Sequence, residues 1–166
     1  MEASFSYPST LSKAERYARF LEDYRLFIDG ETDLIAALAN TSAALREAFG
    51  FFWVGFYLVR DDQWLSLGPF QGTAACARIR HGRGVCGTAW AQARTLVVPD
   101  VDAFPGHIAC SSLSRSEIVV PLTHPASGRI LGVLDIDSDH LATFDDIDRS
   151  GLEAVLQALM QQIPAA

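Results

Sequence analysis

The spacing of apolar residues changes once along this chain, near Phe51, and the change restricts the folds that it can adopt. Residues 1–49 repeat apolar side chains at the period of an α-helix, in two successive segments. Residues 50–142 instead contain short aromatic and β-branched runs between turn residues, which is typical of strands and their connecting loops. Residues 143–166 return to the helical period. This order predicts a single α+β domain over 1–166, with an antiparallel-type sheet flanked by helices.

The helical segments carry start and stop signals. Ser12 and Glu15 form a capping box before the first helix, and Gly30 is a stop signal. A second helix is predicted over about 33–49, and its inner side would carry Leu34, Ile35, Leu38, Leu45 and Phe49. The last helix is predicted to begin near "TFDDID", whose acidic residues suit the N-terminal end of the helix dipole. Its apolar stripe comprises Leu152, Val155, Leu156, Leu159 and Ile163.

The middle of the chain contains the predicted strands. They are the runs "FFWVGFYLVR", "WLSLGPFQG", "TLVVPD", "EIVVPLT" and "GRILGVLDIDS". The stretch "GRGVCGTAWAQAR" indicates a loop that enters a short helix. A loop of about 17 residues, 100–116, precedes "EIVVPLT", and loops of that length in a compact domain are usually functional.

Composition limits the partners of the protein. With 166 residues, 49% of them apolar, the chain is long enough for one sizeable core. Its net charge of −7 argues against nucleic acid or an anionic membrane as the main partner. The N-terminus lacks the features of a signal peptide, and no run approaches the roughly 18 apolar residues of a membrane span. We therefore expect a cytoplasmic protein without a membrane partner.

Three cysteines, Cys76, Cys86 and Cys110, lie among small residues in predicted loops or at a helix start. They could be buried apolar residues, as free cysteines often are, or reactive thiols. Cys86 lies near a helix N-terminus, where the helix dipole can lower the pKa of a thiol. A zinc site completed by His81 or His107 would need two cysteines close together in the sequence. The three cysteines contain no such pair, so we expect no metal.

A group of carboxylates accompanies the last two predicted strands. Asp135 and Asp137 are two residues apart, so they share one face of a strand at a separation of roughly 7 Å. Glu117 opens the neighbouring strand and could join them. Adjacent carboxylates repel one another, which favours a shared cation or a retained proton. The alternative is a solvated strand edge.

Two aromatic residues of the first predicted strand, Trp53 and Tyr57, are four residues apart and share a face. Taken singly, each is typical of a core aromatic.

The motifs resemble those of a known enzyme family. "ACARIRHGRGVCGTAW", "VPDVDAFPGHIACSSLSRSEIVVPL" and "GVLDIDS" are similar to the free methionine-(R)-sulfoxide reductases, which are stand-alone GAF-domain enzymes. The resemblance covers about residues 50–150 and includes the spacing of all three cysteines. It implies a six-stranded antiparallel sheet flanked by helices, a homodimer, and reduction of free methionine (R)-sulfoxide with thioredoxin as electron donor, without a cofactor.

The resemblance also implies roles for individual residues. Cys110 matches the nucleophile, Cys76 the resolving thiol, and Cys86 a third cysteine of variable role. Substrate binding would involve Glu117, Asp135, Asp137, Trp53 and Tyr57. A Cys110 thiolate would attack the sulfoxide sulfur while a protonated carboxyl group donates a proton to the oxygen. The resulting sulfenic acid would condense with Cys76 or Cys86 to a disulfide, which an external dithiol reduces.

Two other functions use the same residues. A non-catalytic GAF sensor would bind a small ligand in the same cavity, although the Asn-Lys part of the cyclic-nucleotide signature does not precede "FDDID". A thiol redox switch would sense oxidant without turning over a substrate. The three spaced cysteines favour the enzyme over the sensor, and turnover of methionine sulfoxide with a dithiol would separate the redox switch from the enzyme.

Overall fold

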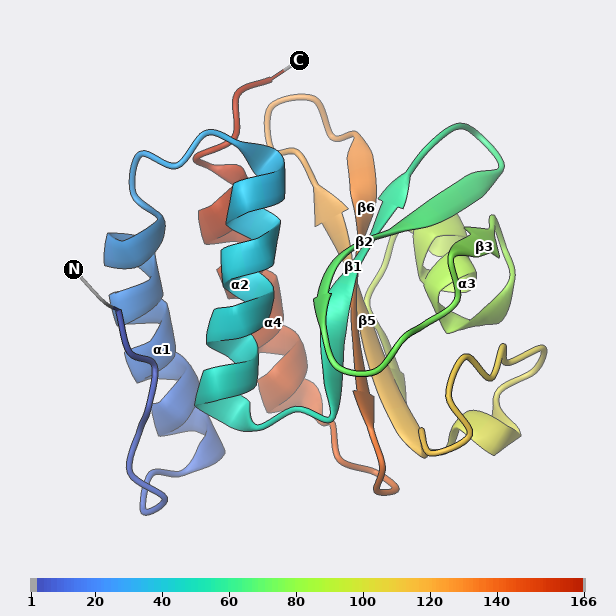
Figure 1. The fold of residues 1–166 in the computed structure, drawn as a ribbon, viewed down its shortest axis with the longest axis horizontal. Helices are drawn as coiled ribbons and strands as arrows, with labels where there is room; N and C mark the ends of the chain where they lie inside the picture. Colours follow the sequence, from blue (N-terminus) through green and yellow to red (C-terminus); the bar gives the residue numbers. More distant parts are fainter. Residues whose placement is uncertain (1–2, 166) are drawn as a thin grey trace.

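A six-stranded antiparallel sheet forms the centre of the computed structural model, which describes residues 3–165 (Figure 1). The order of the strands across the sheet is β3-β2-β1-β6-β5-β4. In chain order the elements are α1 (Lys13–Ile28), α2 (Leu34–Phe49), β1 (Trp53–Val59), β2 (Trp64–Gln71), β3 (Arg78–Arg80), α3 (Gly84–Gln92), β4 (Leu96–Val98), a 3-10 turn (Val101–Ala103), β5 (Ser116–Thr123), β6 (Ile130–Ser138) and α4 (Asp146–Met160). The predicted α+β architecture is confirmed, and β3 is the strand that the apolar pattern did not indicate.

The helices lie on the two faces of the sheet. Helices α1, α2 and α4 cover one face, and α3 lies on the other (Figure 1). The larger apolar core fills the space between the sheet and the three helices, and a smaller core lies beneath α3. Along β6, Leu134 and Ile136 face the larger core, whereas Val133 faces the smaller one. This alternation places Asp135 and Asp137 on the α3 side of the sheet.

Helix α1 is fixed at its start and attached to α4. The predicted capping box of Ser12 and Glu15 is present. Lys13 Nζ lies 2.6 Å from Asp148 Oδ2, and the Tyr17 hydroxyl donates to Asp148 Oδ1 at 2.9 Å. The first and last helices are therefore joined by a buried carboxylate. Within residues 3–165, no helix has the length and apolar character needed to cross a membrane.

Two details of the predicted helices differ from the structure. Ile35, which was expected on the inner side of α2, is 54% exposed and lies in the first turn of the helix. Ile163 is buried as expected, but it lies beyond the end of α4 at Met160. Both differences concern helix ends, where periodicity alone is a weak guide.

Candidate active site

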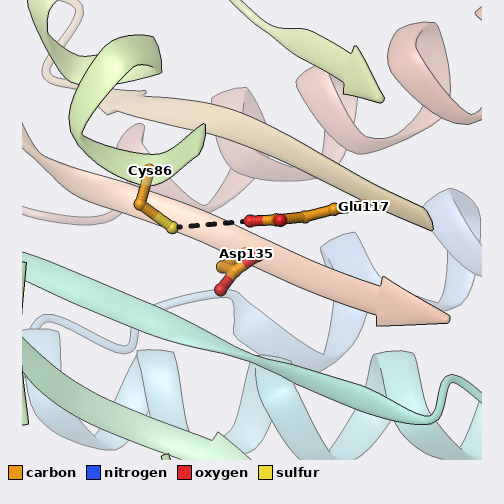
Figure 2. Close-up of side chains that lie close together, drawn as sticks. All are labelled: Cys86, Glu117 and Asp135. Atoms are coloured by element: carbon orange, nitrogen blue, oxygen red, sulfur yellow. Dashed lines mark hydrogen bonds between the residues drawn. The ribbon is translucent and has the colours of Figure 1, made fainter. Parts of the chain in front are cut away.

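Three elements bring a thiol and two carboxyl groups together beneath α3. Cys86 comes from the first turn of α3, Glu117 from β5 and Asp135 from β6 (Figure 2). The Cys86 thiol lies 3.9 Å from Glu117 Oε1, and one ligand atom from each of the three residues lies within 4.8 Å of the others. All three side chains are at least 94% buried. Burying polar groups in this way costs free energy that apolar side chains would not, so packing alone does not explain the cluster.

The strand register places a third carboxyl group beside them. Glu117 of β5 is directly opposite Asp137 of β6, and Asp137 is two residues from Asp135 on the same face. In the other direction, Asp137 is opposite Trp53 of β1. Two adjoining hollows share Cys110, Ser111, Asp135 and Asp137 in their lining, so these groups face one continuous pocket. The sequence prediction that the carboxylates share a strand face is confirmed.

The carboxyl groups strongly affect one another's protonation. Burial raises the pKa of Asp135 from 3.8 to about 6. Burial, together with the charges of Asp135 and Asp137, raises the pKa of Glu117 well above 4.5, and burial and Asp135 raise that of Asp137. Within residues 3–165, no lysine or arginine forms an ion pair with these three groups, and buried Asp135 Oδ1 has no hydrogen-bond partner. The pocket therefore retains protons near neutral pH and is suited to a positively charged ligand.

The thiol of Cys86 differs from the sequence expectation. The helix dipole was expected to lower its pKa, but burial and the charges of Asp135 and Glu117 raise it well above 9.0. The side chain points away from water and toward acids, and these effects outweigh that of a single helix terminus. Cys86 is thus a protonated thiol at neutral pH when the pocket holds no cation.

The other two cysteines form a disulfide. Cys76 lies in the segment between β2 and β3, and Cys110 lies in the loop before β5, with their Cα atoms 5.3 Å apart. Both are half-buried, whereas Cys86 is free and buried. Cys110 lines the same pocket as the carboxyl groups. The fold therefore places the Cys76–Cys110 disulfide beside a set of acids.

Trp53 and Tyr57 are both buried and both line this pocket. Their rings stack with centroids 6.2 Å apart. Trp53 Nε1–H donates to the Thr73 carbonyl at 2.9 Å, and the Tyr57 hydroxyl donates to the Cys76 carbonyl at 2.9 Å. The aromatic wall therefore also holds the segment that carries Cys76, a connection that nothing in the sequence indicates.

His107 is a pocket residue that the predicted site did not include. Its Nε2 lies 3.7 Å from Glu117 Oε2, and its side chain is 14% exposed. Burial lowers the pKa of the imidazole below 6.5, which keeps the ring neutral at pH 7. The only signal in the sequence is its position three residues before Cys110 in the same loop.

The raised pKa of Asp135 leads to a prediction about stability. This pKa lies above that of an unfolded aspartate. The stabilising contribution of the protonated Asp135 side chain is therefore fully present below about pH 4 and is lost as the pH rises through about 6. At pH 8, Asp135→Asn should raise the free energy of unfolding by on the order of 3 kcal/mol, because a neutral group replaces a buried charge. The gain should vanish at pH 4. Urea unfolding of the oxidised protein at both pH values measures it.

The matched control for this prediction is Asp62→Asn, in the exposed turn between β1 and β2. It should change the free energy of unfolding by no more than about 0.5 kcal/mol at either pH. A gain for Asp135→Asn that is equal at pH 4 and pH 8 would show that the buried charge is not its cause.

Comparisons with known proteins define the class first. The GAF domain family matches residues 33–163, which is most of the chain. GAF domain-containing protein A of Dictyostelium discoideum is 59% identical over 148 residues, which are 89% of this chain and 92% of that protein. The protein is therefore a GAF domain in sequence as well as in fold.

More specific relatives identify the family within this class. Free methionine-R-sulfoxide reductase of Escherichia coli is 49% identical over 150 residues, covering 90% of this chain and 89% of the relative. The crystal structure of free methionine-R-sulfoxide reductase from Neisseria meningitidis, in complex with its substrate, is 54% identical, with a TM-score of 0.90. It covers 98% of this chain and 95% of that one. This chain belongs to the free methionine-R-sulfoxide reductase family.

Proposed function

We propose that the protein is an oxidoreductase that reduces free L-methionine (R)-S-oxide to methionine, with Cys110 as the nucleophile. The observation that carries this proposal is the position of Cys110 at a pocket with three carboxyl groups of raised pKa. Reduction of a sulfoxide needs a thiolate at sulfur and a proton at oxygen, and reduced Cys110 and a protonated carboxyl group of the pocket would supply them. The names of the E. coli and N. meningitidis relatives support the same activity.

The proposed first step transfers oxygen from substrate to enzyme. The Cys110 thiolate attacks the sulfoxide sulfur, and a protonated carboxyl group of Glu117, Asp135 or Asp137 donates a proton to the sulfoxide oxygen. The oxygen passes to Cys110 as a sulfenic acid, and methionine leaves with its sulfur reduced by two electrons. A carboxyl group with a pKa raised toward neutrality, such as that of Asp135, is suited to this proton transfer.

The proposed second step forms a disulfide. The Cys76 thiol attacks the Cys110 sulfenic sulfur and water leaves, which yields the disulfide present in the structure. The half-buried position of Cys76 and Cys110 supports access by an external dithiol such as thioredoxin, which would restore both thiols. Cys86 is buried and faces the acids instead, which favours Cys76 as the resolving thiol.

Substrate recognition follows from charge and shape. The ammonium group of a free amino acid would bind the carboxyl groups, which have no cationic partner among residues 3–165. Trp53 and Tyr57 would contact the methyl group and select one epimer. A homodimer, a cytoplasmic location and a single domain over 1–166 belong to the same proposal. The homodimer rests on the family resemblance, and the other two rest on the sequence patterns described above.

The decisive test is a coupled assay with a thioredoxin system on the two epimers of free methionine sulfoxide. The (R) epimer should be reduced and the (S) epimer should not, because the proton donor and Cys110 can flank the sulfur in one handedness only. Reduction of neither epimer would contradict the proposal and favour a sensor or a redox switch. Similar rates on both would show that the pocket does not select between them.

The resolving role of Cys76 has a separate test. Pre-reduced Cys76→Ser should release about one equivalent of methionine per chain, because attack precedes resolution, whereas its steady-state turnover with thioredoxin should fall sharply. Methionine release without reductant and turnover with thioredoxin measure the two steps. Cys86→Ser is the matched control, and it should retain the turnover that Cys76→Ser loses. The reverse pattern would assign the resolving role to Cys86.

A further inference from the structure

We infer that the pocket is also a zinc site, in which Cys86, Glu117 and Asp135 bind one Zn²⁺ ion with His107 as the fourth donor, and that the bound ion excludes the substrate. The metal site itself depends only on the described geometry. The exclusion of substrate rests on the proposed function, because it requires the same carboxyl groups to bind the ammonium group.

Two donor pairs lie close to the spacing of a tetrahedral zinc site. Zinc binds sulfur at about 2.3 Å and nitrogen or oxygen at about 2.0–2.2 Å, which places neighbouring donors about 3.4–3.6 Å apart. Here Cys86 Sγ is 3.9 Å from Glu117 Oε1, and His107 Nε2 is 3.7 Å from Glu117 Oε2. One atom each of Cys86, Glu117 and Asp135 lies within 4.8 Å of the others. These two pairs exceed the tetrahedral spacing by a few tenths of an ångström, and binding of one ion by all four donors requires further rearrangement of the Asp135 and His107 side chains.

The environment of Asp135 independently favours a bound cation. Asp135 is 6% exposed, and its Oδ1 is buried without a hydrogen-bond partner among residues 3–165. Asp135 also lines both hollows of the pocket. A buried carboxylate oxygen without a partner is costly, and a divalent ion would satisfy it. The imidazole of His107 adds a ring nitrogen, which is a common zinc ligand.

The donor set favours zinc over other divalent ions. A thiolate and an imidazole are poor ligands for Mg²⁺ and Ca²⁺, which prefer oxygen, whereas one sulfur, one nitrogen and two oxygens suit Zn²⁺. The four donors come from α3, β5, β6 and the loop before β5. The usual sequence signature of closely spaced ligands is therefore absent, and the site appears only in the folded chain.

The site does not use the redox-active pair. Cys76 and Cys110 are joined to each other, so the oxidised protein has Cys86 as its one free thiol. Zinc that binds the oxidised protein through a thiolate must therefore use Cys86. Zinc binding releases the Cys86 proton, because the thiolate is the ligand.

The test uses oxidised protein and Co²⁺, a spectroscopic substitute for Zn²⁺. We expect one Co²⁺ per chain, with the absorption of a tetrahedral site and a thiolate-to-cobalt charge-transfer band, and displacement by Zn²⁺ but not by Mg²⁺. Cys86→Ser should lose the charge-transfer band. The affinity of Cys86→Ser for Co²⁺ should fall by more than about 100-fold. This exceeds the 10- to 100-fold loss that follows when a residue that only hydrogen-bonds a metal ligand is removed. Asp139→Asn, which removes an exposed carboxylate just after β6, is the matched control and should bind normally.

A second measurement tests exclusion of the substrate. Zn²⁺ should raise the concentration of methionine (R)-sulfoxide needed for half-maximal first-turnover methionine release by the reduced protein, and this increase should be far smaller in Cys86→Ser. Equal effects of zinc on the wild type and on Cys86→Ser would overturn the exclusion.

The two proposals fail separately. No cobalt–thiolate band in the oxidised protein, or a band that persists in Cys86→Ser, would overturn the zinc site even if the enzyme reduces methionine sulfoxide. A band without any reduction of methionine sulfoxide would contradict the proposed function and leave the zinc site supported.

Discussion

Replacing Cys110 with serine should abolish reduction of free methionine (R)-sulfoxide without unfolding the protein. A hydroxyl group is a far weaker nucleophile than a thiolate at neutral pH, so both the first turnover and the steady state should be lost. We expect a loss of at least about 10³-fold in kcat/KM, the scale seen when a nucleophile is removed from an active site. Methionine release by the pre-reduced variant and turnover with thioredoxin measure it.

A neighbouring residue gives the matched control for this experiment. Ser112 lies two residues after Cys110 in the same loop and is exposed, so Ser112→Ala should retain activity. Circular dichroism under reducing conditions compares the folds without the contribution of the Cys76–Cys110 disulfide. Substantial methionine release by Cys110→Ser would show that another group attacks the sulfur.

Blocking the amino group of the substrate should have the second large effect. N-acetylation removes the positive charge of methionine (R)-sulfoxide and adds bulk where Glu117, Asp135 and Asp137 converge. The loss of a buried charged hydrogen bond of about 3 kcal/mol corresponds to a decrease on the order of 100-fold in kcat/KM. Methionine sulfoxide within a peptide should be an equally poor substrate, because its nitrogen is an uncharged amide.

Measurement of kcat/KM on the free and the N-acetylated (R)-sulfoxide decides this prediction. Asp135→Asn and Asp137→Asn should reduce the difference in kcat/KM between the two substrates, mainly by lowering kcat/KM for the free amino acid. Rates on the two substrates that agree within about threefold, a gap of less than 1 kcal/mol, would reject the ammonium-binding role of the carboxyl groups.

Much of the fold could be predicted from the sequence because local patterns determine it. The alternation along "GVLDIDS" placed Asp135 and Asp137 on one face, and the structure confirms this with Leu134 and Ile136 on the other. The change of period near Phe51 separated the helical and the strand regions. Strand β3 has one apolar residue between two arginines, so the apolar spacing did not indicate it, whereas the apolar run of the equally short β4 was recognised.

The environment of the site could not be predicted in the same way, because it depends on contacts between distant segments. The helix dipole at Cys86 is a local property, but the burial and the acids that raise its pKa come from β5 and β6. Likewise, the proximity of His107 to Glu117 depends on how the loop before β5 folds back over the sheet. Sequence spacing contains no information about either contact.

The order of the strands has a consequence for how the chain acquires its structure during synthesis. Strand β6 is the last to be made, yet it lies in the middle of the sheet between β1 and β5. The β1–β2 hairpin therefore keeps an open edge until Ile130–Ser138 leaves the ribosome, and such edges are prone to pair with other chains. Two of the three pocket carboxylates are also on β6. A nascent or truncated chain that ends before this strand has neither a closed core nor an acidic pocket, so completion of the fold and of the candidate active site is a single late event.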